Sequence, residues 1–144
     1  MFKMTDSQLI AKALEAREMS YSPYSNFQVG AALLAKDGRV FQGCNIENAA
    51  YTPSNCGERT AFFKAVSQGV TEFEAIAIVG GPKGNSAENG TLELCFPCGV
   101  CRQVMREFCD IDAFRVITAK STEDYVVNTL GELLPNSFGP QDLA

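Results

Sequence analysis

The chain has 144 residues, of which 46% are hydrophobic and 20% charged, so we predict a single globular domain over residues 1–144. Its formal net charge of -5 provides no overall attraction for polyanions, which argues against a nucleic-acid partner. Histidine is absent, which excludes Ser-His-Asp and Cys-His nucleophilic sites and every histidine-ligated metal.

The N-terminal stretch MFKMTDSQLIAKALEAREM carries charges throughout and lacks the apolar region of a signal peptide. No apolar run approaches the roughly 18 residues of a membrane span, so we expect a cytoplasmic protein without a membrane partner. Thiols stay reduced in that compartment. The six cysteines are therefore expected to be metal ligands, catalytic groups or small core residues rather than disulfides.

Hydrophobic patterning and turn signals predict the following elements in chain order. Thr5 and Gln8 form a possible capping box that opens a helix to about residue 19. The other predicted elements are a hairpin of strands 27–35 and 40–45, a helix over 56–68, a strand over 75–79, a loop over 80–90, a helix over 99–108, strands over 114–118 and 125–127, and a short helical turn in the tail.

Strands that alternate with helices after a hairpin imply crossover connections and a mixed sheet with helices on its faces. We therefore predict the α/β class, with a three-layer α/β/α sandwich around a central mixed five-stranded sheet.

Three cysteines can converge in this arrangement. Cys98 and Cys101 are spaced i, i+3 in the first turn of one predicted helix, and Cys56 opens the other. If both helices begin at one edge of the sheet, their positive dipole ends lower the thiol pKa values and favour thiolates. The pattern predicts a zinc site with three thiolates and a fourth position open to water, as in catalytic zinc sites.

Two charged residues follow Cys56. Glu58 can exchange protons with water at the metal if Cys56 sits at the helix cap, because residues i and i+2 of a regular helix do not share a face. Arg59 lies three residues after Cys56 and could offset the excess negative charge of three thiolates through hydrogen bonds to sulfur.

Other interpretations of the cysteines are weaker. Cys95 is read as a small core residue, with contact to the metal left open, and Cys44 and Cys109 as buried apolar groups. An iron–sulfur site lacks its fourth cysteine, and a redox CxxC leaves the third thiol and Glu58 without a role. A closed structural zinc site would need Cys95 or Glu58 as fourth ligand.

Cys56-Gly57-Glu58, followed 42 residues after Cys56 by Cys98 of a PCxxC motif, matches the signature of zinc-dependent nucleobase deaminases. Longer stretches, SPYSNFQVGAAL, GCNIENAAY, NCGERTA, PCGVCRQV and ELLPNSFGPQDL, resemble the small homotetrameric cytidine deaminases of pyrimidine salvage. These stretches span residues 22–143, most of the chain.

The resemblance implies roles for individual positions. Cys56, Cys98 and Cys101 match the ligands of one zinc ion per subunit, and Glu58 matches the proton shuttle. The substrate contacts that it implies are Phe27 against the pyrimidine, Asn45 and Glu47 at the ribose 3′-hydroxyl, the Gly57 N–H at the base carbonyl, Phe138 in a neighbouring subunit's site, and Tyr51 in an interface-lining loop. Gln103 matches a family glutamine whose role stays open.

The expected activity is hydrolytic deamination of free cytidine and deoxycytidine. Alternatives are deamination of blasticidin S or of another cytosine compound, and a structural zinc module without catalysis. One departure is Gly57, where the family usually has alanine. Glycine keeps the N–H but costs about 1 kcal/mol relative to alanine within a helix. We therefore expect the same activity, whereas the resemblance does not predict its magnitude.

Overall fold

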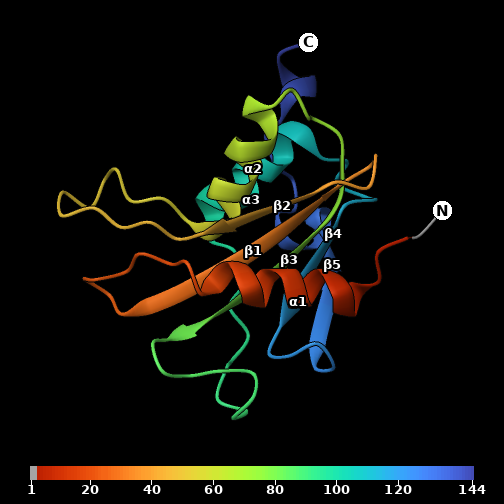
Figure 1. The fold of residues 1–144 in the computed structure, drawn as a ribbon. Helices are drawn as coiled ribbons and strands as arrows, with labels where there is room; N and C mark the ends of the chain where they lie inside the picture. The colour runs from red at the N-terminus through yellow and green to blue at the C-terminus, as the bar shows by residue number, and fades with distance from the viewer. Residues whose placement is uncertain (1–2) are drawn as a thin grey trace.

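The computed structural model describes residues 3–144, so the first two residues of the predicted domain lie outside the described residues. The helices and strands follow one another along the chain as shown in Figure 1. They are α1 (Asp6–Arg17), β1 (Phe27–Ala35), β2 (Val40–Cys44), α2 (Gly57–Ser67), β3 (Phe73–Pro82), α3 (Gly99–Phe108), β4 (Arg115–Ala119), β5 (Tyr125–Thr129), α4 (Leu130–Leu133) and a 3-10 turn (Pro140–Asp142).

The five strands form one mixed sheet in the order β2-β1-β3-β4-β5. Strand β1 is antiparallel to both β2 and β3, β3 is parallel to β4, and β4 is antiparallel to β5. The parallel pair needs a crossover, which α3 provides between β3 and β4. The predicted five-stranded mixed sheet is confirmed.

Both faces of the sheet are covered by helices, because successive side chains of β1 point to opposite faces. Ala32 and Leu34 pack on one side with Leu9 and Ile10 of α1. The intervening residues of β1 pack on the other side against α2 and α3; the buried members of that core include Ala31, Leu33, Phe62, Met105 and Phe114. Figure 1 shows α1 on one side of the sheet and α2 with α3 on the other, which confirms the three-layer sandwich.

The helix starts follow local sequence signals. Thr5 caps α1 through the predicted capping box, in which its side chain and that of Gln8 each accept a backbone N–H. The helix ends at Arg17, two residues before the predicted boundary. Among residues 3–144, no helix combines the length and the apolarity that crossing a bilayer requires.

The predicted loop over residues 80–90 is wrong in its first residues. Gly80, Gly81 and Pro82 belong to β3, where they pair with Val29, Gln28 and Phe27 of β1. Glycine and proline indicate a loop locally, but a long partner strand offers hydrogen bonds that extend the ladder, and proline is tolerated at a strand end. The extension brings the end of β3 beside the start of β1.

Candidate metal centre and active site

Three cysteine sulfurs meet where α2 and α3 begin. Cys56 is the N-cap of α2, Cys98 is the N-cap of α3, and Cys101 lies in the first turn of α3. The Sγ atoms of Cys56 and Cys98 are 3.9 Å apart, those of Cys98 and Cys101 are 3.5 Å apart, and all three lie within 4.8 Å of one another. The fold therefore brings together the three cysteine side chains that the sequence spacing predicted as zinc ligands.

The separations of the sulfurs fit zinc. Zn–S bonds of about 2.3 Å in a tetrahedral site place neighbouring sulfurs about 3.8 Å apart. A disulfide would need about 2.05 Å, and all six cysteines are free thiols. The residues present thus supply three soft ligands with the separations that zinc requires, and a tetrahedral ion held by them has a fourth position for another group.

The environment stabilises the Cys56 thiolate. A hydrogen bond from Cys101 and another from Arg59, whose Nη2 lies 3.1 Å from Cys56 Sγ, lower the pKa of Cys56 to about 5. The pKa of Cys101 is raised because its thiol proton serves the bond to Cys56 and because the side chain is buried. The lowered pKa of Cys56 favours a negative charge on its sulfur at the start of α2, where the helix dipole also favours it.

Glu58 lies in the first turn of α2, and only 5% of its surface is exposed. Burial, reinforced by the nearby charge of Cys56, raises the pKa of Glu58 to about 7. Cys56 has an extended backbone, with φ -74° and ψ 154°, so it sits at the cap as predicted and not within the helix. Glu58 lies near enough to the cluster for the charge of Cys56 to act on its carboxyl, although the two residues are two positions apart. A carboxyl group with a pKa near neutrality is suited to both accepting and releasing a proton.

The other cysteines stay outside the cluster. Cys95 is half-buried, and burial raises its pKa to about 11. Cys109 is buried and Cys44 half-buried, and burial raises the pKa of both thiols. Among the described residues, the group of side chains that could hold a metal contains Cys56, Cys98 and Cys101 and none of these three, which suits a packing role for them.

Asn45 is held against β1 by its own side chain. Its Oδ1 accepts from the backbone N–H of Val29 at 2.9 Å and from the Ser20 hydroxyl, and its Nδ2 donates to the carbonyl of Phe27 at 2.8 Å. One amide hydrogen is left for a ligand. The structure thus gives Asn45 a positioning task, with Ser20 as a partner, that sequence reasoning missed.

Glu47 has a similar anchoring task. Its Oε1 accepts from the backbone N–H groups of Tyr24 and Ser25 at 3.0 and 3.1 Å, and its Oε2 accepts from the Ser25 hydroxyl. These bonds hold the turn that leads into β1, where the Phe27 side chain is 37% exposed. The serines of the SPYSN stretch were the available signal for this contact, since serine hydroxyls commonly bond nearby groups in turns.

The remaining predicted substrate residues occupy different places. Gly57 is buried at the start of α2. Tyr51 is 72% exposed, adopts a positive φ of 62° and meets Tyr24 edge to face with ring centroids 6.3 Å apart. Phe138 is 59% exposed on the C-terminal segment. The structure places Tyr51 and Phe138 on the surface of the chain and not within the sulfur cluster.

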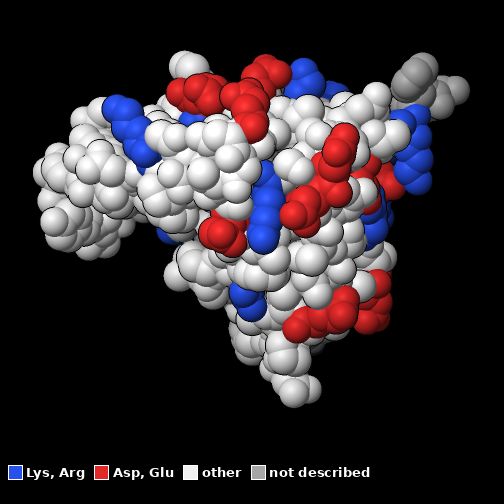
Figure 2. Space-filling view, turned by 90° about the horizontal axis from the view of Figure 1, so that it is seen from below, with Lys and Arg blue, Asp and Glu red and all other residues white. Residues whose placement is uncertain are grey.

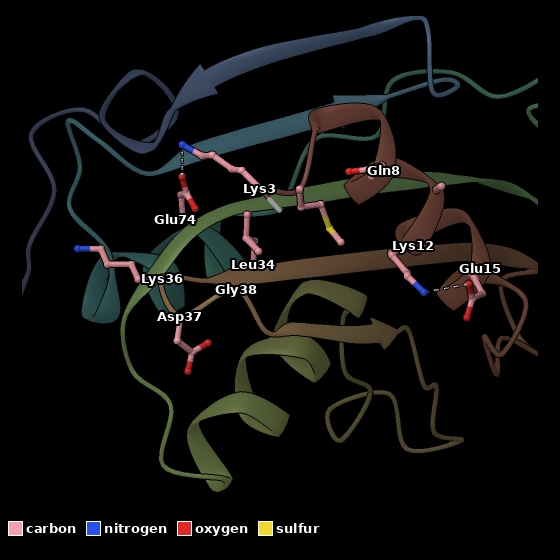
Figure 3. Close-up of a pocket in the computed structure, with 11 residues that line it drawn as sticks. Lys3, Gln8, Lys12, Glu15, Leu34, Lys36, Asp37, Gly38 and Glu74 are labelled. Atoms are coloured by element: carbon pink, nitrogen blue, oxygen red, sulfur yellow. Dashed lines mark ion pairs between the residues drawn. The ribbon is translucent and has the colours of Figure 1, made fainter. Parts of the chain in front are cut away.

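A large hollow of roughly 1040 Å³ lies on the opposite face of the sheet, between α1 and the turn that joins β1 to β2. Figure 3 shows two ion pairs among the residues that line it, Lys3 with Glu74 at 3.3 Å and Lys12 with Glu15 at 3.8 Å. The residues described as lining it include no cysteine. Size alone therefore does not mark it as the reactive site, and the chemistry belongs to the sulfur cluster.

Comparison with known proteins identifies relatives over nearly the whole chain. The sequence model of the "Cytidine and deoxycytidylate deaminase zinc-binding region" matches residues 3–118. A cytidine deaminase of Sporosarcina psychrophila is 48% identical over 141 residues, which cover 98% of this chain and 96% of the relative. The blasticidin-S deaminase of Bacillus cereus is 29% identical over 133 residues, 92% of this chain and 91% of that protein.

The fold agrees with these sequence matches. The crystal structure of cytidine deaminase from Burkholderia pseudomallei superimposes with a TM-score of 0.81 at 47% identity, covering 94% of this chain and 100% of that one. The matched residues 3–118 contain the three converging cysteines and Glu58. The chain belongs to the family of zinc-binding cytidine and deoxycytidylate deaminases.

Proposed function

We propose that the chain catalyses the hydrolytic deamination of free cytidine and deoxycytidine to uridine and deoxyuridine. The observation that carries this proposal is the buried carboxyl of Glu58, which interacts with Cys56 and Cys101 of the three converging cysteines. Similarity to a cytidine deaminase is also much higher than to a blasticidin-S deaminase, at 48% against 29% identity, which disfavours the antibiotic as the main substrate.

Cys56, Cys98 and Cys101 hold one zinc ion per subunit in this proposal. When bound, zinc supplies a Lewis acid that makes a water molecule acidic near neutral pH. Glu58 accepts a proton from that water while the water oxygen bonds to C4 of the base. Glu58 delivers this proton to N3. It then takes the second proton from the hydroxyl now bonded to C4 and delivers it to the amino group, so that the C4–N4 bond breaks and ammonia leaves. One water is consumed for each ammonia released, so the atoms balance.

The residues around the cluster are proposed to orient the nucleoside. Phe27 packs on the pyrimidine, and the backbone N–H of Gly57 faces the base carbonyl. Asn45 and Glu47 receive the ribose 3′-hydroxyl. Both are already bonded to the start of β1 and its preceding turn, so their remaining hydrogen-bonding capacity is pre-oriented for a ligand.

We further propose that residues 1–144 form a single catalytic domain that assembles as a homotetramer, with Tyr51 and Phe138 at subunit contacts near the active sites. The high exposure of both rings, 72% and 59%, supports this placement, because large exposed aromatic side chains are common at interfaces. The enzyme would serve pyrimidine salvage in the cytoplasm.

A polynucleotide substrate is disfavoured by the surface charge. Figure 2 shows acidic and basic side chains interspersed on the viewed face of the described residues, and the chain has a net charge of -5. Binding of single-stranded nucleic acid requires a positively charged groove along the backbone path. A free nucleoside substrate does not need such a groove.

One experiment tests the function directly. Protein of measured zinc content is incubated with cytidine, deoxycytidine and blasticidin S, and uridine, deoxyuridine and ammonia are quantified. We expect release of ammonia from both nucleosides, with blasticidin S converted poorly. Fully zinc-loaded protein that releases no ammonia from cytidine would contradict the proposal. Preferential conversion of blasticidin S would show that the antibiotic, and not the free nucleoside, is the main substrate.

A further inference from the structure

Side chains of α3 bond the C-terminal segment on both sides of Phe138. Gln103 Nε2 donates to the backbone carbonyl of Phe138 at 2.9 Å. Arg106 Nε donates to the Ser137 hydroxyl at 2.9 Å, and its Nη2 donates to Gln141 Oε1 at 2.9 Å. The segment is thus bonded to α3 at the Phe138 backbone carbonyl and, on either side of it, through the side chains of Ser137 and Gln141.

Arg106 shows how closely the segment is held. Its side chain is buried, with 8% exposed, and among the described residues it has no ion-pair partner. A buried guanidinium bonded to neutral groups is costly unless those bonds are well made. At Gly139 an added Cβ would lie 2.3 Å from Arg106 Cζ, so the chain passes directly against the guanidinium.

The same helix also holds the loop that carries a metal ligand. Arg102 Nε donates to the carbonyl of Pro97 at 2.7 Å, next to Cys98, and its Nη1 donates to the carbonyl of Leu133 at 2.6 Å. The C-terminal segment and the Cys98 loop therefore take their positions from one rigid element.

The fixed backbone contrasts with the free ring. Phe138 is 59% exposed although its own carbonyl and the side chain of the preceding Ser137 are bonded to α3. A ring that is so exposed contributes little to the core of this chain. Local hydrogen bonds that order an exposed aromatic side chain lower the entropy cost when that side chain later makes a contact.

We propose that Gln103 and Arg106 are positioning residues that hold Phe138 so that its ring completes the nucleoside site of a neighbouring copy of this chain. The inference rests on the proposed function and assigns a task to Gln103, which the sequence left open. Gln103 and Arg106 act through Phe138 and do not touch the substrate.

A double-mutant cycle tests the inference, using zinc-loaded full-length protein and cytidine as substrate. Gln103→Glu keeps the size of the side chain but removes the donor to the Phe138 carbonyl. We expect KM to rise roughly three- to tenfold, the value of one hydrogen bond, with kcat nearly unchanged. In the Phe138→Ala background, Gln103→Glu should have no further effect.

Arg106→Lys provides a second route to the same outcome, because it retains the positive charge but loses the directed pair of bonds. We expect it to raise KM in wild type and not in Phe138→Ala. Glu107→Gln is the matched control, since Glu107 is exposed on the same helix, and it should leave KM unchanged. Zinc content and elution volume should equal those of wild type throughout.

The contrary outcomes are distinct. Equal rises in KM in both backgrounds would show that Gln103 acts independently of Phe138 and overturn the inference while deamination stands. Phe138→Ala with an unchanged KM, or Gln103→Glu with a smaller assembly, would also overturn it. Wild-type protein that is zinc-loaded but inactive would instead contradict the proposed function. In that case hydrogen exchange of amides 137–142 still tests the positioning task. Equal exchange rates in wild type and Gln103→Glu would contradict it.

Discussion

The Arg59 guanidinium donates a hydrogen bond to the Cys56 sulfur, with Nη2 and Sγ 3.1 Å apart. Three thiolates around a divalent ion leave one excess negative charge, and this bond places a positive charge against the sulfur that opens α2. The same contact helps to lower the pKa of Cys56. Arg59 therefore favours the ligand in the form that binds metal.

Replacing Arg59 with glutamine should weaken zinc binding by roughly 10- to 100-fold, the usual effect of losing a partner of a metal ligand. Competition with a chromophoric chelator at pH 7 measures the change. Arg59→Lys should fall between wild type and Arg59→Gln, because it keeps the charge without the planar fork. Equal affinities for all three proteins would show that the contact is incidental.

Glu58→Gln should retain zinc but lower kcat for cytidine by roughly 100- to 10,000-fold, because an amide of the same shape cannot exchange the proton. Steady-state kinetics and metal analysis on the same preparation check the result. An active Glu58→Gln enzyme with full zinc content would assign the proton transfers to another group.

Cys98→Ser should lose at least tenfold in zinc affinity, since a neutral hydroxyl replaces a thiolate ligand. Cys95→Ser is the matched control, because Cys95 lies outside the sulfur cluster and its pKa is raised to about 11. Metal analysis after dialysis should find zinc in Cys95→Ser only. The reverse result would identify Cys95 as a ligand.

Close backbone packing positions α2 on the sheet. An added Cβ at Gly43 of β2 would lie 2.4 Å from the Ala61 nitrogen and 2.5 Å from the Gly57 carbonyl oxygen, atoms that cannot move without shifting the helix. Gly43→Ala should lower the free energy of unfolding by about 2–3 kcal/mol and reduce zinc content, as overpacking displaces the turn that carries Cys56 and Glu58.

Gly57→Ala provides the comparison. Its Cβ would lie 3.2 Å from Val29 Cγ1 and 3.3 Å from the Val29 carbonyl oxygen, contacts that need a shift of only a few tenths of an ångström. The change in free energy of unfolding should stay within about 1 kcal/mol, because the helix propensity of alanine offsets the tighter contact. Urea unfolding of both variants measures the difference, and equal losses would contradict the packing argument.

Stability should depend on the ionisation of Glu47. The Ser25 hydroxyl, aided by the backbone N–H groups of Ser25 and Tyr24, holds the pKa of Glu47 below its ordinary value. A carboxyl group whose folded pKa is depressed contributes stability above its unfolded pKa of about 4.3 and loses it as the pH falls through the folded pKa. Glu47→Gln should therefore melt below wild type at pH 7, and the gap should close below pH 4.

Thermal melts of wild type and Glu47→Gln at pH 7, 5 and 3.5 provide the measurement. Taking the difference between the two proteins removes pH effects that both share, including those on the thiols. A gap in melting temperature that stays constant over this range would show that the hydrogen bonds to Glu47 do not depend on its charge.

Much of the fold could be predicted from local patterns. Thr5 with Gln8, the hairpin around residues 36–39 and the strand over 27–35 each depend on neighbours in the sequence, and all three are present in the structure. The end of β3 was not predictable in this way. Gly80 to Pro82 form a strand because β1 pairs with them, and that pairing joins residues about fifty positions apart in the chain.

The sequence by itself determined which side chains are available for chemistry: without histidine, thiols and carboxylates are the usual zinc ligands that remain, and their spacing puts Cys56 and Cys98 at helix starts. Tertiary structure decided how they act. It brought two helix ends to one point, buried Glu58 so that its pKa rises to about 7, and turned Asn45 toward β1. Local propensity depends on adjacent residues, whereas burial and convergence depend on long-range packing that a single sequence pattern does not specify.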